Sequence, residues 1–155
     1  MKTTDYIGIK PSNEVVNGLS QLLADFQVHY ANLRGFHWNI KGKSFFVLHE
    51  KFESMYNDAA EKVDEIAERI LTLGGSPENR LSTYASASNV KEVHQVTDGA
   101  AAIQSVLETY KVLIAQERSL LKAASDSEDE GTVALMSDYI AQQEKTVWML
   151  VAYAS

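Results

Sequence analysis

The stretch "RGFHWNIKGKSFFVLHEKFESMY", Arg34 to Tyr56, combines a break in a helical pattern with two histidines in apolar surroundings. Gly42 is the natural turn residue of the short "KGK" break. His37 stands before the break, His49 follows it, and Glu53 comes one helical turn later. Two interpretations follow: the histidines are satisfied groups of a hydrophobic core, or they are half of a metal site whose remainder lies elsewhere.

Apolar residues recur at helical spacing on both sides of this break. The segment before it opens at Pro11 and Ser12 and continues to Ile40. The segment after it is predicted to start at Ser44. It is predicted to end at "GGSP", residues 74–77, because a glycine followed by a proline is typical of a helix C-terminus. Two long helices joined by a tight turn are therefore expected.

The remainder of the chain predicts a polar connector and two more helices. Residues 76–97 lack strong periodicity, apart from a brief helix expected near "YASAS". Helical spacing returns over Ala101–Leu121, and the acidic turn "SDSEDEG" precedes a last helix that carries apolar residues over Val133–Tyr153. Ser127 with Glu130 has the form of a capping box for that last helix.

The predicted fold class is all-α, because no segment shows the period-two alternation of a strand. Four long helices are joined by short, long and short connections. The connector over residues 76–97 is long enough to run from one end of a helix bundle to the other. Such a crossover is typical of the ferritin-like four-helix bundle rather than the simple up-down form. The extra helix is expected within the long connector. We expect one domain over residues 1–155, with 1–11 as a short N-terminal extension.

Composition narrows the classes of function. The 155 residues are 45% hydrophobic and 23% charged, as in an ordinary globular protein. The absence of cysteine excludes disulfides, thiolate catalysis and cysteine-ligated clusters. The N-terminus lacks the apolar region of a secretory signal, and no apolar run reaches the roughly 18 residues that a membrane span requires. We expect a cytoplasmic protein with no membrane partner.

The predicted second helix places several acids on the face that carries His49. At about 100° per residue, Glu53 lies about 40° round from His49, Asp64 about 60° and Glu68 about 100°. However, the 15 residues between His49 and Asp64 correspond to about 22 Å along the axis. A single metal ion cannot contact both within one straight helix.

Two antiparallel copies of this helix would bring the separated groups together. His49 and Glu68 have their midpoint between positions 58 and 59. Glu53 and Asp64 have the same midpoint. A twofold axis near Asn57–Ala60, where small residues at 59 and 60 permit close approach, would therefore build two identical clusters. The candidate site consists of His37, His49 and Glu53 from one chain, with Asp64 and Glu68 from its mate.

Imidazole together with carboxylate suits a divalent transition metal such as Fe(II), Mn(II) or Zn(II). A di-iron site inside one bundle normally uses Glu-x-x-His on two helices, and this sequence contains no Glu-x-x-His. The composition of the candidate cluster thus favours a site shared between chains over a site within one bundle.

Each candidate residue also has a structural interpretation. A histidine near an apolar face is more often a satisfied core residue than a ligand. Asp64 and Glu68 fit a solvated face, paired with Lys62 and Arg69. Trp38 fits a packing role, with a redox role beside the metal as the alternative.

The segment "HWNIKGKSFFVLHEKFESMYNDAAEKVDEIAERILTLGG", His37 to Gly75, resembles the signature of the Dps family of mini-ferritins. The spacing of the His-Trp pair, the second histidine, the acid four residues later and the Asp-x-x-x-Glu matches throughout. The order of the helices and the "VWML" near the C-terminus extend the similarity over nearly the whole chain.

This resemblance implies a hollow homo-oligomer, a dodecamer, with a ferroxidase centre at its twofold interface. Carried over by position, the ligands are the five residues of the candidate site. The substrates implied are Fe(II) and hydrogen peroxide, the latter preferred to dioxygen, and the Fe(III) product is stored in the cavity. Other divalent metals also suit the ligands. Storage would protect against oxidative stress by withdrawing both reactants from hydroxyl-radical chemistry.

The acidic turn has two interpretations. The resemblance implies iron passage through negatively charged threefold pores, and electrostatic focusing would raise the local Fe(II) concentration there. A solubilising loop that complements the helix dipole is the alternative. Ala134 stands where many family members carry another acid, so the pore pattern is incomplete. The candidate pore residues are Asp126, Glu128, Asp129 and Glu130.

A DNA-compacting function is the alternative to iron oxidation. Some members of the family bind DNA through a lysine-rich terminal tail, whereas here the stretch before Pro11 holds only Lys2 and Lys10, against Asp5. A net charge of -7 per chain should repel duplex phosphates. We therefore expect weak DNA binding or none. A purely structural helical oligomer is a third interpretation, and it predicts no bound metal.

Overall fold

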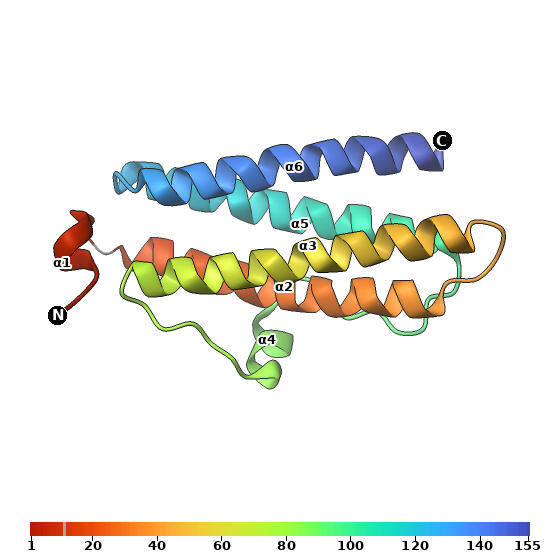
Figure 1. Ribbon diagram of the computed structural model, residues 1–155, viewed down its shortest axis with the longest axis horizontal. Helices are drawn as coiled ribbons and strands as arrows, with labels where there is room; N and C mark the ends of the chain where they lie inside the picture. The colour runs from red at the N-terminus through yellow and green to blue at the C-terminus, as the bar shows by residue number, and fades with distance from the viewer. Residues whose placement is uncertain (11) are drawn as a thin grey trace.

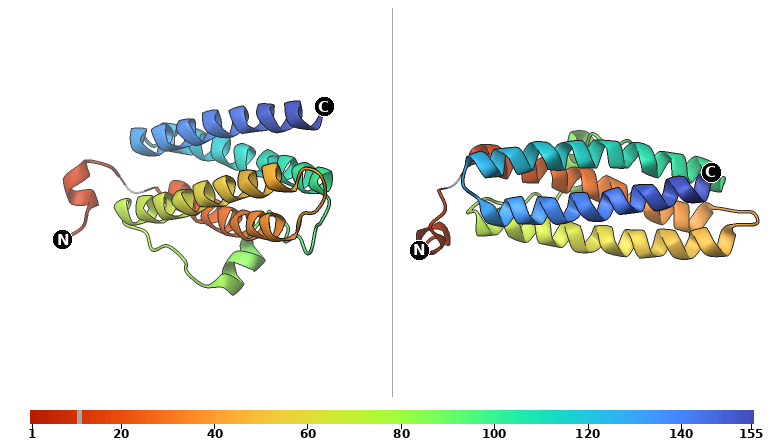
Figure 2. Two further views of the ribbon diagram at one scale, coloured as in Figure 1. Left: turned by 45° about the vertical axis from the view of Figure 1, so that its right-hand side comes forward. Right: turned by 90° about the horizontal axis from the view of Figure 1, so that it is seen from above.

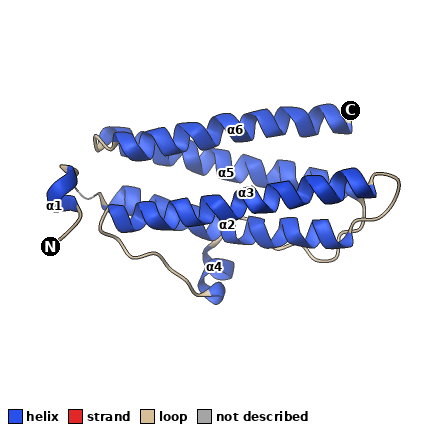
Figure 3. Ribbon diagram, in the orientation of Figure 1, coloured by secondary structure: helices blue, strands red, loops and turns tan. Residues whose placement is uncertain are grey.

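The computed structural model describes residues 1–10 and 12–155. These residues form six helices and no strand, which confirms the all-α prediction (Figure 3). The helices are α1 (Thr4–Ile7), α2 (Asn13–Asn39), α3 (Phe45–Thr72), α4 (Leu81–Ala87), α5 (Gly99–Asp126) and α6 (Glu130–Ala154).

The two helices around the quoted stretch lie where the sequence predicts them. Ser12 is the N-cap of α2, and its side-chain oxygen accepts a hydrogen bond from the backbone N–H of Val15; Pro11 lies outside the described residues. Gly42 in the following turn has a φ of 105°, a conformation that glycine adopts without steric cost. The turn therefore directs α3 back along α2.

The C-terminus of α3 is also as predicted. Gly74 has a φ of 82°, and the N–H of Gly75 donates a 2.9 Å hydrogen bond to the carbonyl oxygen of Ile70. This left-handed glycine satisfies the last carbonyls of the helix and releases the chain into the connector. The short α1 was not predicted, because the residues before Pro11 carry no helical periodicity.

The arrangement of the four long helices is that of a ferritin-like bundle (Figure 1). Helix α3 runs antiparallel to α2, and α6 runs antiparallel to α5. The connector that contains α4 crosses the length of the bundle, so α5 runs in the same direction as α3. The turn between α2 and α3 lies at the same end as the C-terminus of α6, and the turn between α5 and α6 lies at the opposite end (Figure 2).

Buried polar side chains of α2 hold the connector in place. Asp25 is fully buried, and one oxygen of its carboxylate accepts hydrogen bonds from the Ser88 hydroxyl at 3.0 Å and the Asn89 backbone N–H at 2.7 Å. The Asn32 amide donates to the carbonyl oxygen of Lys91 at 2.8 Å. These bonds satisfy backbone groups that the irregular connector cannot pair within itself.

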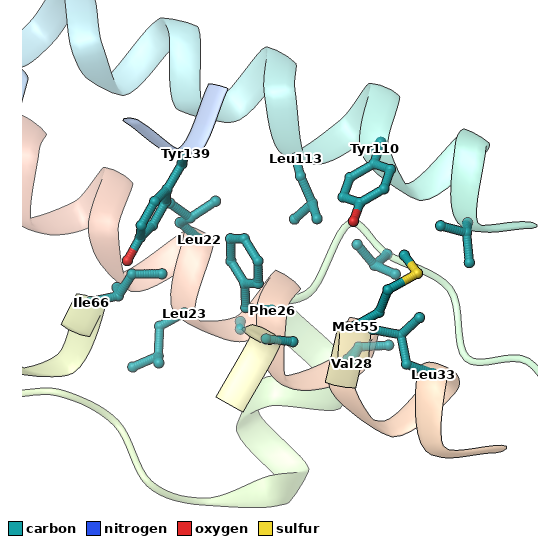
Figure 4. Packing of buried hydrophobic residues seen from close by; sticks show 14 of the residues in the cluster. Leu22, Leu23, Phe26, Val28, Leu33, Met55, Ile66, Tyr110, Leu113 and Tyr139 are labelled. Atoms are coloured by element: carbon teal, nitrogen blue, oxygen red, sulfur yellow. The ribbon is translucent and has the colours of Figure 1, made fainter. Parts of the chain in front are cut away.

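The core fills the space between the four long helices (Figure 4). Phe26 of α2, Met55 and Ile66 of α3, Leu113 of α5 and Tyr139 of α6 all contribute to it, and each is buried. Truncation of a fully buried phenylalanine in such a core costs about 3–5 kcal/mol. In the part of the chain that the structure describes, no helix is both long and apolar enough to cross a membrane.

The capping box predicted for the last helix is wrong. Helix α6 begins at Glu130 with Asp129 as its N-cap, and the Asp129 carboxylate accepts a 3.0 Å hydrogen bond from the backbone N–H of Thr132. The Ser127 hydroxyl instead donates back to the Ala123 carbonyl oxygen at the end of α5. Aspartate is as good an N-cap as serine, so the type of residue does not by itself distinguish position 129 from position 127.

Candidate metal centre

The turn between α2 and α3 brings His37 and His49 face to face. Their rings are stacked, with centroids 3.7 Å apart and planes 15° apart. Each Nδ1 lies 2.7 Å from the backbone carbonyl oxygen of the other histidine. The two predicted histidine ligands therefore form one reciprocal unit that closes the start of the hairpin.

These two hydrogen bonds fix the chemistry of both rings. A carbonyl oxygen can only accept, so each Nδ1 carries a hydrogen and donates it. In a neutral imidazole of this tautomer the lone pair is on Nε2. A metal-binding histidine usually donates its other ring N–H in this manner, which orients the ring and raises its basicity. His37 and His49 are thus arranged as Nε2 donors.

Aromatic neighbours hold the pair on both sides. The ring of Phe45 stacks on His49 with centroids 4.9 Å apart, and the ring of Tyr56 meets His37 edge-on at 5.3 Å. His37 is buried, whereas His49 is half-buried. The aromatic contacts restrict rotation of both imidazole rings.

The three predicted carboxylates lie on the exposed side of α3. Glu53, Asp64 and Glu68 are all exposed, and Glu53 is one turn beyond His49. Helix α3 runs without interruption from Phe45 to Thr72, so the separation of about 22 Å between His49 and Asp64 holds. Among the described residues of a single chain, no group of three or more metal-ligating side chains is close enough to hold one ion.

The ion pairs proposed as the structural alternative for Asp64 and Glu68 do not form. Lys62 is buried and bonds both Asp58 oxygens at 2.7 Å. Arg69 bonds Asp129 at 2.5 Å. Within residues 1–10 and 12–155, no hydrogen bond or ion pair engages the side chain of Asp64 or Glu68. Both carboxylates therefore remain available to a ligand.

The acidic turn divides into one structural residue and three exposed ones. Asp129 is buried and is committed to Arg69, Thr132 and the α6 backbone, so the structure gives it a role other than pore lining. Asp126 is exposed and pairs with Lys122 at 2.8 Å. Glu128 and Glu130 are exposed.

Trp38 is not a core residue. It is 65% exposed, next to His37, and the guanidinium carbon of Arg34 lies 5.5 Å from its ring. Arg34 also lies over the ring of Tyr30 at 4.4 Å. In the single chain, the packing interpretation of Trp38 is therefore not realised.

The middle of the bundle contains a polar group that the sequence did not single out. Glu117 of α5 is fully buried, and one oxygen accepts a 2.6 Å hydrogen bond from the Gln143 amide. Its other oxygen has no partner among the described residues. Burial raises the pKa of Glu117 to about 8, although Gln143 and Lys62 act in the opposite direction. No short-range motif marks this residue, because its partners come from other helices.

His29 is also buried in the middle of the bundle, between Phe26 and Tyr110. Burial lowers its pKa to about 3, and the positive charge of Lys62 adds to this effect. His29 is therefore a neutral core residue near neutral pH.

Comparisons with known proteins agree with this architecture. The model of the ferritin-like domain family matches residues 16–155. The "DNA protection during starvation protein" of Porphyromonas gingivalis is 51% identical over 99% of this chain and 98% of its own length. The DPS protein of Vibrio cholerae O1, described as "a member of a broad superfamily of ferritin-like diiron-carboxylate proteins", superposes with a TM-score of 0.95 at 46% identity, covering 100% of this chain and 99% of that one. This chain belongs to the ferritin-like family and, within it, to the Dps proteins.

Proposed function

We propose that this protein is a ferroxidase that oxidises Fe(II), preferably with hydrogen peroxide, and stores Fe(III) inside a hollow oligomer. Family membership supports the broader role in iron storage and stress protection. The single observation that supports the finer proposal is the reciprocal bonding of His37 and His49, which engages both Nδ1 atoms and leaves the Nε2 atoms as the candidate metal donors.

The centre is shared between two subunits in this proposal. An antiparallel crossing of two α3 helices, centred between positions 58 and 59, brings Asp64 and Glu68 of one copy to the histidines of the other. The crossing point differs in one respect from the sequence expectation. Ala59 is buried within its own bundle, so Ala60 is the small residue left for close approach.

The ligand set suits iron as a substrate. The Asp64 and Glu68 carboxylates supply negative charge that stabilises Fe(III) more than Fe(II), which favours loss of an electron. The histidines supply neutral donors, and the small number of protein ligands leaves coordination positions for peroxide. Two Fe(II) ions give two electrons to one peroxide, which takes up two protons and yields two waters. Transfer of both electrons avoids release of a hydroxyl radical.

The exposed acids of the α5–α6 turn are proposed to attract iron. Arg69, adjacent to Glu68 in sequence, contacts Asp129, so this turn lies beside the carboxylate half of α3. Asp126, Glu128 and Glu130 would raise the local concentration of Fe(II) there. We leave Asp129 out of the proposed pore because its carboxylate is buried and paired.

Two relatives are named as proteins of DNA protection during starvation. We propose that this protein protects DNA by removing Fe(II) and peroxide rather than by contact with DNA. The net charge of -7 per chain opposes binding to phosphates. In a gel-shift at low salt without metal, we expect no retardation of duplex DNA. Tight binding under these conditions would contradict this part of the proposal.

The decisive experiment is the double variant Asp64→Ala with Glu68→Ala. Both side chains are exposed in the single chain, so the fold should survive. We expect peroxide-driven Fe(II) oxidation to slow on the order of 100-fold, because the metal loses both charged ligands from one side. The matched control, Glu14→Ala with Glu92→Ala, removes the same charge from exposed positions elsewhere. Wild-type rates in the first variant would remove these residues from the site.

A further inference from the structure

Phe46 and Leu71 are large exposed apolar side chains near the two ends of α3. Phe46 is 81% exposed and Leu71 is 54% exposed, although both belong to a helix whose opposite face forms the core. Phe46 lies three residues before His49, and Leu71 lies three residues after Glu68. These two residues therefore bracket the positions of the proposed ligands along α3.

Phe46 and Leu71 also share the face of α3 that carries those ligands. At about 100° per residue, Phe46 lies about 60° round from His49, and Leu71 lies about 40° round. Val47 is 60% exposed but lies about 160° round, so it points away from this face. The large exposed apolar side chains of the ligand face thus lie at its two ends.

The two residues have the same midpoint as the proposed ligand pairs, between positions 58 and 59. An antiparallel crossing centred there places Phe46 of one copy opposite Leu71 of the other, just as it places His49 opposite Glu68. A twofold axis determines which positions of the two helices lie opposite one another once its centre is set, so the same crossing accounts for both pairs. One antiparallel alignment of the two α3 helices therefore pairs both the proposed ligands and the two apolar residues.

Phe46 also contacts Phe45, the aromatic residue that stacks on His49. Its ring meets the ring of Phe45 edge-on with centroids 5.3 Å apart, and Phe45 stacks on His49. A partner side chain placed on Phe46 would therefore lie immediately outside the histidine ligand.

We propose that Phe46 of one subunit packs against Leu71 of the partner subunit and closes the outer end of each shared iron centre to bulk water. This inference rests on the proposed function, and the occupant of the apolar face is a second copy of this chain. Closure excludes water from the centre, which strengthens the attraction between the carboxylates and iron and confines reactive oxygen species.

Cysteine cross-linking tests the proposal cleanly, because the natural chain contains no cysteine. In the variant Phe46→Cys with Leu71→Cys, the two positions of one chain are about 37 Å apart along α3. A disulfide requires Cα atoms within about 7 Å, so any bond between these positions must join two subunits. Under mild oxidation, we expect most chains to migrate as dimers on a denaturing gel without reductant.

The matched control is Val47→Cys with Leu71→Cys, in which the first cysteine moves off the ligand face by one residue. We expect this variant to remain at least ten-fold less cross-linked. Equal cross-linking of the two variants, or none in the Phe46 variant, would overturn the proposal.

A charge-pair variant provides a second test that does not depend on thiol chemistry. Phe46→Lys alone should lower the assembled fraction at least ten-fold, measured by sedimentation, because it leaves an ammonium against the partner's Leu71. Adding Leu71→Glu should restore assembly by pairing the two charges. Absence of restoration in a folded double variant would overturn the proposal.

The outcomes also separate this contact from the ferroxidase proposal. Suppose that the Phe46 variant cross-links while the variant Asp64→Ala with Glu68→Ala oxidises iron at the wild-type rate. This outcome would support the contact and contradict the proposed iron centre. Absence of cross-linking together with loss of oxidation in that carboxylate variant would support the iron centre and overturn the contact.

Discussion

The Nδ1 atoms of His37 and His49 each lie 2.7 Å from the backbone carbonyl oxygen of the other residue. Each histidine therefore fixes the backbone that carries its neighbour. The side chains of α2 and α3 are coupled at the start of the hairpin, and in the neutral form of this tautomer the lone pair of each ring is on Nε2.

Replacement of His37 by alanine is expected to weaken the first metal-binding step by at least roughly ten-fold. The variant loses one Nε2 donor and also the ring that stacks on His49. Anaerobic calorimetric titration with Fe(II) measures the affinity. The exposed His94→Ala should bind as the wild type does. An unchanged affinity in the His37 variant would show that the ion does not bind this pair.

Glu117 is expected to make stability depend on pH. Burial raises its pKa to about 8 from 4.5, so between these values the native state holds a proton that the unfolded state has lost. Stability should be greatest below about pH 4.5 as far as this group is concerned. The free energy of unfolding should fall by about 1.4 kcal/mol per pH unit as the pH rises from about 4.5 toward about 8, and it should then level off.

Glu117→Gln keeps the shape of the side chain and removes the titration. We expect the melting temperature of this variant to vary less between pH 5 and 8 than that of the wild type, and to exceed it at pH 8, in scans at fixed protein concentration. The exposed Glu92→Gln serves as the control. Parallel pH profiles for wild type and Glu117→Gln would contradict the assignment.

Asp129 is expected to be a stability residue and not a pore residue. Asp129→Ala removes the N-cap of α6 and leaves the guanidinium of Arg69, which is largely buried, without its carboxylate. The free energy of unfolding should fall by about 3 kcal/mol, as measured by denaturant titration.

The exposed acids of the same turn should behave in the opposite way. Asp126→Asn with Glu130→Gln should change stability by about 1 kcal/mol or less and slow iron uptake by the assembled protein. Unchanged uptake in this variant would support the interpretation of the turn as a solubilising loop.

Much of the fold follows from local signals in the sequence. Ser12, Gly42 and Gly74 mark helix ends through capping and positive φ, and the structure has helix boundaries at each of them. The choice between Ser127 and Asp129 as the N-cap could not be made locally. It is decided by Arg69, sixty residues away, whose guanidinium bonds the Asp129 carboxylate.

The candidate site could be predicted only in part for a similar reason. Helical spacing identifies the face of α3 that carries the acids. The hydrogen bonds that set the tautomers of His37 and His49 use backbone oxygens, which have no signature in a sequence. Glu117 was missed because its burial and its Gln143 partner arise from the packing of α5 against α6.

The distance of about 22 Å that separates His49 from Asp64 on α3 has a genetic consequence. A chain with His49→Ala and a chain with Asp64→Ala plus Glu68→Ala are each expected to oxidise Fe(II) much more slowly than the wild type when expressed alone. Co-expressed, they can pair so that one of the two clusters receives an intact histidine half and an intact carboxylate half. Up to half of the normal oxidation rate should then return in each mixed pair, and the two defective alleles would complement one another.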